Sequence, residues 1–443
     1  MDSLDADSSQ HRWIVHDFAR REKGLLTGKH ISVSLHCRGS PLRSSSIRFV
    51  LLVTGANLLG YMDRVCISVL APKLRAELGF SATDIGLIFG AFGLSYALFQ
   101  MPWGMLADRR RTGIIIGAVI LAWSLFTGLT AIAHGLAAFV AIRFLFGISE
   151  SALAPSVASL FRRALPAHSR PTAFGSFLAG GRIGGIIAPG FAAVLAIRYG
   201  WRSVFVIFAG LGVFAAAVWF KASPREERIA ESESARLTFR VKTLSISLSA
   251  LIMVGFAYTM TWQFFVTWFP TYLIESRSFS FQKAGTYTGL PFLFGLAATF
   301  AGGPLSQWST KYFGTIFGRR LIVVTGLLGS AVLLFLGRST QDAVLGTILI
   351  ALAAGAGDLI LSTVWASVVD IGERSAGAVA GLMNSVASLG AFLSPVLVGK
   401  LLQHGASWGY ILTAGALVNV IAALLWLFVR PPVRIGATTG VQV

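Results

Sequence analysis

The strongest constraint on the fold is a series of long apolar segments that recurs between residues 47 and 430. Each segment is about 20 residues long, which is the helix length that crosses the ~30 Å hydrocarbon layer of a bilayer. We therefore predict an all-α membrane protein with twelve transmembrane helices. The predicted spans are 47–70, 84–105, 113–133, 136–160, 172–196, 203–221, 246–274, 284–304, 321–337, 343–370, 376–402 and 407–430.

Composition supports this class and excludes others. The chain is 55% hydrophobic and only 13% charged, whereas a soluble domain is about 25% charged. The net charge of +18 does not indicate a nucleic-acid partner, because the Lys and Arg residues lie in short loops between apolar spans. Such loops contact the headgroups of the lipid bilayer and set orientation. The two cysteines, Cys37 and Cys66, lie in different contexts and predict no disulfide framework.

The polar stretches divide the chain into five parts. We predict a disordered cytoplasmic tail (1–46), a six-helix bundle (47–221), a cytoplasmic linker (222–245), a second six-helix bundle (246–430) and a cytoplasmic tail (431–443). One alternate set of connections carries more Lys and Arg residues than the other set, and the linker belongs to this basic set. The positive-inside rule then places both termini in the cytoplasm and the protein in the cell (inner) membrane.

The two halves of the chain also resemble each other. Gly184-Gly-Ile-Ile-Ala-Pro189 matches Gly390-Ala-Phe-Leu-Ser-Pro395, and Gly175 precedes Gly381 by the same offset. Two six-helix pseudo-repeats with a site between them are typical of a secondary transporter.

Five charges fall inside the apolar spans of the first half, namely those of Asp63, Arg64, Arg143, Glu150 and Arg182. A charge at the bilayer centre costs about 2.5–3.5 kcal/mol on insertion scales, so it indicates a pathway or a binding site by default. The alternative is a salt bridge that only holds helices together. Arg143 and Glu150 are seven residues apart, so they face the same way about 10 Å apart along a helix.

The surplus of guanidinium groups predicts an anionic ligand, because the planar fork of Arg binds both oxygens of a carboxylate. Burial disfavours the ionised form of a carboxylate and a nearby Arg favours it. We therefore predict that Asp63 and Glu150 couple transport to protons. A permanent salt bridge between Glu150 and Arg143 is the alternative.

The second half has fewer charges in its spans. Asp358 is left open between three roles: a contact with Arg182, a cation site, or a position facing water. Trp268 and Trp408 are interpreted as interfacial anchors. Candidate substrate-binding residues are Tyr61, Arg64, Tyr96, Arg143, Arg182, Ser362, Thr363, Trp365 and Asn384.

Two motifs resemble known families. Gly104-x-Leu106-Ala107-Asp108-Arg109 resembles the signature between the second and third helices of the major facilitator superfamily, which implies a gating role for Asp108 and Arg109. Asn57-x-x-x-Tyr61-x-Asp63-Arg64-x-x-Ile67-Ser68 resembles the first helix of its anion:cation symporter branch, and Arg143-Phe144-x-x-Gly147-x-x-Glu150 fits the same branch.

The resemblance implies the major facilitator fold, alternating access and carriage of sugar acids or other anions. It assigns proton coupling to Asp63 and Glu150, and it makes Arg143 the partner of Glu150. It assigns substrate contact to Tyr61, Arg64, Tyr96 and Asn384. Arg182 has no position in the family pattern, and its extra charge favours a more acidic substrate such as a dicarboxylate.

Together these observations predict a proton symporter that imports a small organic anion such as galactonate, glucarate or a hexuronate, acting as a monomer. The alternatives are a symporter of an aromatic or dicarboxylate anion, a sodium-coupled carrier, or a membrane sensor that binds the anion without moving it. We predict no enzyme activity, no cofactor and no metal site, because no span holds a nucleophile–base pair or a cluster of metal ligands.

Overall fold

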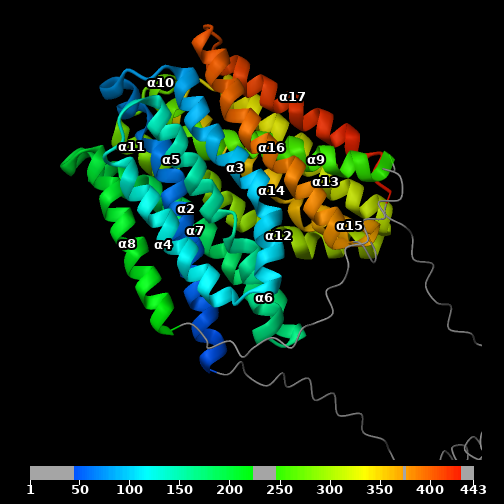
Figure 1. Ribbon diagram of the computed structural model, residues 1–443. Helices are drawn as coiled ribbons and strands as arrows, with labels where there is room; N and C mark the ends of the chain where they lie inside the picture. Colours follow the sequence, from blue (N-terminus) through cyan, green and yellow to red (C-terminus); the bar gives the residue numbers. More distant parts are fainter. Residues whose placement is uncertain (1–43, 223–245, 373–375, 431–443) are drawn as a thin grey trace, which may run out of the picture. The chain divides into compact units, whose positions relative to one another are not determined.

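The computed structural model describes residues 44–222, 246–372 and 376–430, which form helices joined by short connections (Figure 1). Most of the predicted tails and linker (1–46, 222–245 and 431–443) lie outside these residues. The helices are α2 (Ser44–Leu78), α3 (Ala82–Arg109), α4 (Thr112–Thr130), α5 (Gly135–Glu150), α6 (Leu153–Ala164), η1 (Ala167–Ser169), α7 (Arg170–Tyr199), α8 (Trp201–Ala222), α9 (Ile246–Thr267), α10 (Phe269–Glu275), α11 (Phe281–Tyr287), α12 (Leu290–Phe313), α13 (Thr315–Ser339), α14 (Ala343–Asp358), α15 (Leu361–Gly372), α16 (Ala376–Gln403) and α17 (Trp408–Trp426).

Twelve helical segments in the described part of the chain are long and apolar enough to cross a membrane, which confirms the predicted fold class. The fourth, eighth and tenth spans each consist of two consecutive helices: α5 with α6, α11 with α12, and α14 with α15. The seventh span ends at Thr267, earlier than predicted. Pro270 then occupies the first turn of the separate helix α10, a position where its missing N–H has no partner to lose.

Two of the interruptions occupy matching places in the two halves. The fourth span breaks at Ser151 and Ala152, directly after Glu150. The tenth span breaks at Leu359 and Ile360, directly after Asp358. Interrupted helices in corresponding positions of two halves are the usual indication of a transporter binding site near the bilayer midplane.

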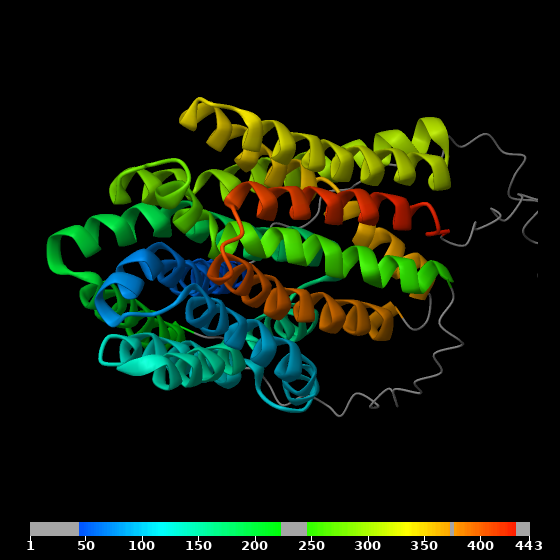
Figure 2. The same cartoon turned by 90° about the horizontal axis from the view of Figure 1, so that it is seen from above.

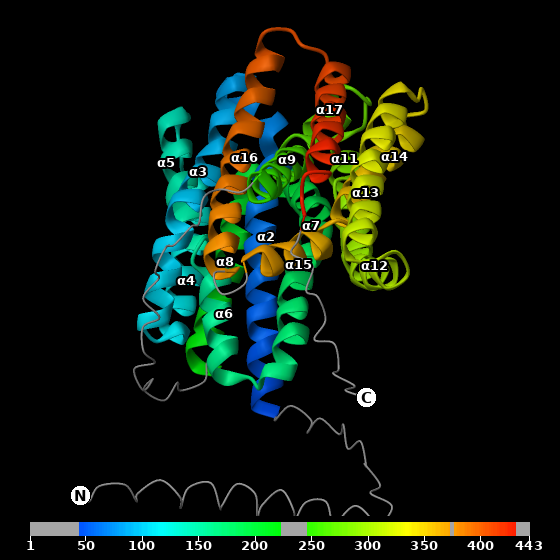
Figure 3. The ribbon, with the colours of Figure 1, turned by 90° about the vertical axis from the view of Figure 1, so that its right-hand side faces the viewer.

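We call α2–α8 the N-terminal half and α9–α17 the C-terminal half. Figure 2 shows α9 lying between α16 and α17 inside the C-terminal half. The main contacts between the halves join α3 to α16, which lie side by side in Figures 1 and 3, and join α7 to α11 and α12.

Glycines make the contact between α3 and α16 very close. A Cβ atom on Gly86 would lie 2.6 Å from the carbonyl oxygen of Pro395, and one on Gly93 would lie 2.6 Å from the carbonyl carbon of Ala391. No side chain fits at such distances, so the two backbones pack directly on each other. Small residues are the usual means of bringing membrane helices this close. We call this contact the glycine seam.

The halves also meet at the end of the helices marked by Leu78 and Gln403, which we call the Leu78 end. Here Arg75 Nη1 lies 2.6 Å from Glu275 Oε1 across the two halves. The prediction that Trp268 and Trp408 are interfacial anchors is wrong, because both side chains are buried. Their indole N–H groups donate inside the protein, from Trp268 to the Pro395 carbonyl at 3.1 Å and from Trp408 to Glu275 at 3.2 Å.

Candidate functional site

The centre of the N-terminal half is an ion pair between α2 and α5. Arg64 Nη2 lies 2.5 Å from Glu150 Oε1, and Arg64 Nε lies 3.4 Å from Glu150 Oε2, so both oxygens of the carboxylate are engaged. The Glu150 side chain is 3% exposed and the Arg64 side chain 19%. Gly60, one turn before Arg64, leaves room for the carboxylate, which would lie 3.5 Å from a Cβ at that position.

Three aromatic rings surround the Arg64 guanidinium. Its central carbon lies 4.6 Å from the centre of the Tyr61 ring, 4.7 Å from Phe92 and 5.4 Å from Tyr96. Such cation–π contacts stabilise a guanidinium by roughly 0.5–2 kcal/mol each, most strongly where water is excluded. We call Tyr61, Phe92 and Tyr96 the aromatic cage. The cage holds Arg64 in one orientation and leaves its charge available to an anion.

Asp63 and Arg143 lie next to this pair but are not joined to it. Asp63 is 1% exposed, and within the described ranges neither of its carboxylate oxygens has a hydrogen-bond partner. Arg143, 2% exposed, donates from Nη1 to the backbone oxygen of Asp63 at 3.4 Å and lies 4.9 Å from the centre of the Phe146 ring. The expected pairing of Arg143 with Glu150 is replaced by the pairing with Arg64, because Glu150 turns toward α2.

A second buried ion pair crosses between the halves. Arg182 Nη2 on α7 lies 2.6 Å from Asp358 Oδ2 at the end of α14, and the two side chains are 14% and 0% exposed. The Tyr258 hydroxyl on α9 donates to the other oxygen of Asp358 at 2.5 Å. The Arg182 guanidinium lies 4.0 Å from the centre of the Trp262 ring. Of the three roles left open for Asp358, the structure therefore shows the contact with Arg182.

The remaining predicted substrate residues lie on α15 and α16. Thr363 is buried and donates to Ser306 on α12 at 3.0 Å. Ser362 and Trp365 are three residues apart on a less buried face of α15, and Trp365 is 44% exposed. The Asn384 amide on α16 donates to Gln100 on α3 at 2.7 Å and so joins the two halves.

The predicted gating residues lie at the other end of α3. The Asp108 carboxylate accepts from Arg162 at 2.9 Å and from Ser159 at 3.2 Å, both on α6. Arg163 donates to the backbone oxygen of Asp108 at 3.0 Å, whereas Arg109 is exposed. Asp108 therefore joins the end of α3 to α6, the second part of the fourth span.

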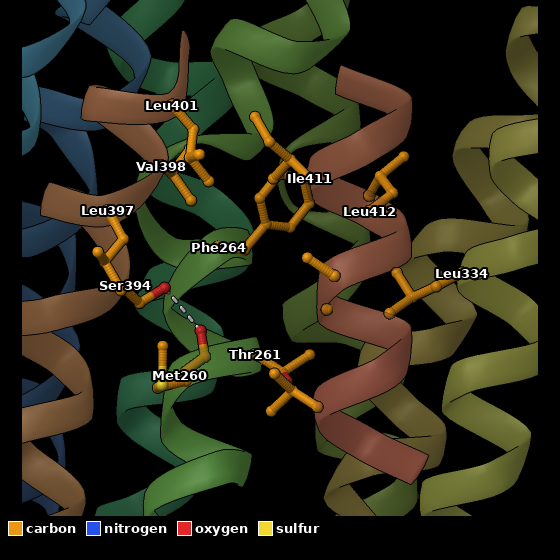
Figure 4. Close-up of a pocket in the computed structure, with 13 residues that line it drawn as sticks. Met260, Thr261, Phe264, Leu334, Ser394, Leu397, Val398, Leu401, Ile411 and Leu412 are labelled. Carbon is orange, nitrogen blue, oxygen red and sulfur yellow. Dashed lines mark hydrogen bonds between the residues drawn. The ribbon is translucent and has the colours of Figure 1, made fainter. Parts of the chain in front are cut away.

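An apolar cavity of about 140 Å³ lies elsewhere, between α9, α13, α16 and α17. Figure 4 shows its lining, where the only marked hydrogen bond runs from the Ser394 hydroxyl to the Met260 backbone oxygen, 2.8 Å long. The lining carries no charged side chain, so this cavity does not suit an anion. Within the described part of the chain, no three His, Cys, Asp or Glu side chains gather closely enough to hold a metal.

Sequence reasoning missed some partners in this region. Phe92 of the aromatic cage and Gln100, the acceptor of Asn384, were not among the candidate residues. Nor was the pair of Arg75 and Glu275. Phe92 and Gln100 each lie four residues, about one helical turn, from Tyr96 on α3, so helical spacing from Tyr96 was the available signal.

Comparisons with known proteins bear on the family and the fold of the chain. The family model of the Major Facilitator Superfamily matches residues 53–313. The chain is 30% identical over 410 residues to the hexuronate transporter of Bacillus subtilis (strain 168), covering 89% of this chain and 96% of that protein. It is 28% identical over 420 residues to a probable galactarate/D-glucarate transporter of the same organism, covering 86% and 90%.

One solved structure supports the fold alone. A bacterial homologue of the human lysosomal transporter Spinster, in an inward-facing and occupied conformation, superposes with a TM-score of 0.75 at 20% sequence identity. The match covers 87% of this chain and 97% of that chain.

Proposed function

The chain belongs to the major facilitator superfamily, whose members are transporters and not enzymes, and we propose that it imports a sugar acid together with protons by alternating access. The relatives are named as a hexuronate transporter and a probable galactarate/D-glucarate transporter, and these compounds are carboxylates with several hydroxyl groups. The observation that carries the proposal is the half-buried Arg64 guanidinium, surrounded by its aromatic cage and paired with Glu150.

The substrate carboxylate binds Arg64 in competition with Glu150. Arg64 already presents its fork in a fixed orientation, so a second carboxylate of the same geometry can replace that of Glu150. Tyr61 and Tyr96 then supply hydroxyl groups beside the sugar chain. Ser362, Trp365 and Asn384 approach from the C-terminal half, as proposed substrate contacts.

Protons compensate the carboxylates that lose their partners. Glu150 released from Arg64 would be a buried anion without a cation, which is costly, so it takes up a proton. Asp63 is already buried without a hydrogen-bond donor among the described residues, and it holds the second proton in this state. Arg143 contacts the backbone of Asp63, so movement of α2 against α5 alters both sites together.

The contacts between the halves indicate the direction of opening. The glycine seam and the Arg75–Glu275 pair close the Leu78 end. The distribution of Lys and Arg supports a cytoplasmic location for the opposite end, which holds the basic Arg109–Arg111 connection. We infer a protein of the cell membrane with cytoplasmic termini, in a state closed to the outside, and acting as a monomer.

The test is transport by the purified protein in proteoliposomes. Labelled hexuronate or glucarate should exchange across the bilayer in counterflow and should accumulate against its gradient when an inward proton gradient is imposed. Replacing sodium with choline should leave accumulation unchanged. Binding without exchange would indicate a sensor, and accumulation that requires sodium would indicate the other coupling ion. Empty liposomes and liposomes treated with a protonophore are the controls.

A further inference from the structure

Asp358 has in the C-terminal half the position that Glu150 has in the N-terminal half, and each of the two carboxylates forms a buried ion pair with an arginine. Glu150 is the last residue of α5 and Asp358 is the last residue of α14, and each precedes a two-residue break in its span. Each carboxylate is buried and pairs with an arginine of a neighbouring helix. Each arginine lies over aromatic rings, those of the cage for Arg64 and that of Trp262 for Arg182.

The two arginines are neighbours of one aromatic cluster. Tyr61, one turn before Arg64, packs with Trp262 around Val65, Val266 and Phe292. The Tyr61 ring also lies 2.7 Å from where a Cβ of Gly181 would be, and Gly181 adjoins Arg182. The guanidinium groups therefore face a common central region from two sides.

The ion pair with Asp358 does not satisfy every N–H group of Arg182. Its Nη1 is buried, and among the described residues it has no hydrogen-bond partner. Gly295 on α12 provides the space around the pair, because a Cβ there would lie 3.2 Å from that same Nη1 and 2.3 Å from Asp358 Oδ2. A buried N–H group without an acceptor destabilises the protein, and an anionic ligand at this place would satisfy it.

We propose that Arg182 is a second anion subsite, which binds the far anionic group of a two-ended substrate while Arg64 binds the near one. This inference rests on the proposed function and adds a substrate class to it: sugar acids with an acidic group at both ends. Asp358 occupies the subsite when no substrate is present. Tyr258 keeps its hydrogen bond to Asp358 when Arg182 turns to the substrate, so the released carboxylate retains one donor.

The pair also lies between the halves, which gives the second anionic group a further effect. Arg182 belongs to α7 and Asp358 to α14, so a ligand that takes Arg182 from Asp358 removes a contact between the halves. A substrate with one carboxylate leaves this contact in place. The subsite thus selects the substrate and at the same time removes one of several contacts between the halves.

The test compares two open-chain sugar acids that differ only at the far end, galactonate with a terminal hydroxymethyl group and galactarate with a second carboxylate. Dissociation constants are measured on the purified full-length protein by thermal shift and by isothermal titration. We expect wild-type protein to bind galactarate at least about tenfold more tightly, since a hydrogen-bonded charge pair is gained. Arg182→Gln should remove that preference and leave galactonate binding within about threefold.

Two further variants keep the result interpretable. Arg182→Gln alone leaves Asp358 buried and unpaired, so the double variant Arg182→Gln/Asp358→Asn removes both charges and should fold where the single one does not. It should show the same loss of preference. Arg198→Gln removes an exposed arginine from the same helix α7 and should retain the preference.

The outcomes separate the two proposals. Equal loss of both ligands in the Arg182 variants, or equal binding of both ligands by wild-type protein, would overturn the second subsite while leaving sugar-acid transport in place. Failure of wild-type protein to bind either ligand would overturn both.

Discussion

Arg75 on α2 and Glu275 on α10 form an ion pair of 2.6 Å that joins the two halves at the Leu78 end. The side chains are 30% and 37% exposed, so their attraction is screened by water. Pairs of this kind contribute about 0.2–1 kcal/mol. That is too little to hold the protein together, but it is enough to bias an equilibrium between two nearly equal states.

Reversing one charge of this pair should open the Leu78 end. In Arg75→Glu the two carboxylates repel, so we expect a larger share of molecules with the halves separated there. Spin labels at the positions of Tyr199 and Tyr410, both exposed at this end, should then lie farther apart. Pulsed electron paramagnetic resonance measures the distance between the two labels. The swap Arg75→Glu/Glu275→Arg should restore the wild-type distance. An unchanged distance in Arg75→Glu would show that the pair has no part in closure.

A side chain added to the glycine seam should also open the Leu78 end, here by steric contact and not by charge repulsion. In Gly93→Ala the new Cβ would lie 2.6 Å from the backbone of Ala391, so α3 and α16 must move apart. Overpacking of this kind costs about 1–3 kcal/mol. The labels at the Leu78 end should again separate. Gly55→Ala is the matched control, because nothing lies within 4 Å of its added Cβ.

Arg64→Lys should weaken substrate binding although the charge is kept. An ammonium group cannot present two parallel N–H donors to a carboxylate and stacks less well on the aromatic cage. We expect the dissociation constant for a sugar acid to rise by about tenfold or more, since one charge-assisted hydrogen bond is lost. Isothermal titration measures it, with Arg198→Lys as the control. Wild-type affinity in Arg64→Lys would exclude bidentate binding by this residue.

Glu150→Gln should separate binding from energy coupling. The amide still occupies the place of the carboxylate beside Arg64 but cannot take up and release a proton. We expect counterflow to remain within about threefold of wild type, because a neutral hydrogen bond replaces a charged one at a single position. Accumulation driven by a proton gradient should be lost. Glu77→Gln, at the Leu78 end of the same α2 that carries Arg64, should retain both activities. Normal accumulation by Glu150→Gln would remove this residue from the coupling mechanism.

The number and order of the helices were predictable because they depend on local properties of the chain. An apolar segment of sufficient length must span the bilayer wherever its neighbours lie. The same reasoning fails for Trp268. Its apolar ring and polar N–H suit an interface in general, but here the Pro395 carbonyl satisfies the N–H inside the protein.

The choice of ion-pair partners depends on how each helix is rotated about its axis. Spacing along α5 correctly places Arg143 and Glu150 in the same buried interior. The same spacing does not predict that the Arg64 side chain of α2 pairs with Glu150, or that Arg143 contacts only the backbone of α2. Spans that are apolar on all sides carry little periodic signal, so their rotation is decided by packing, through contacts such as those of Gly60 and Gly181.

The breaks after Glu150 and Asp358 limit how the fourth and tenth spans can turn during transport. A break in a helix leaves backbone N–H and C=O groups without their regular partners, and lipid tails offer no replacement. Ser151 is wholly buried and Ile360 is too, so protein now shields both places from the acyl chains. Any conformation in the cycle must keep them shielded or wetted, which restricts these two spans to rocking and bending and forbids a rotation that would bring the breaks to the lipid.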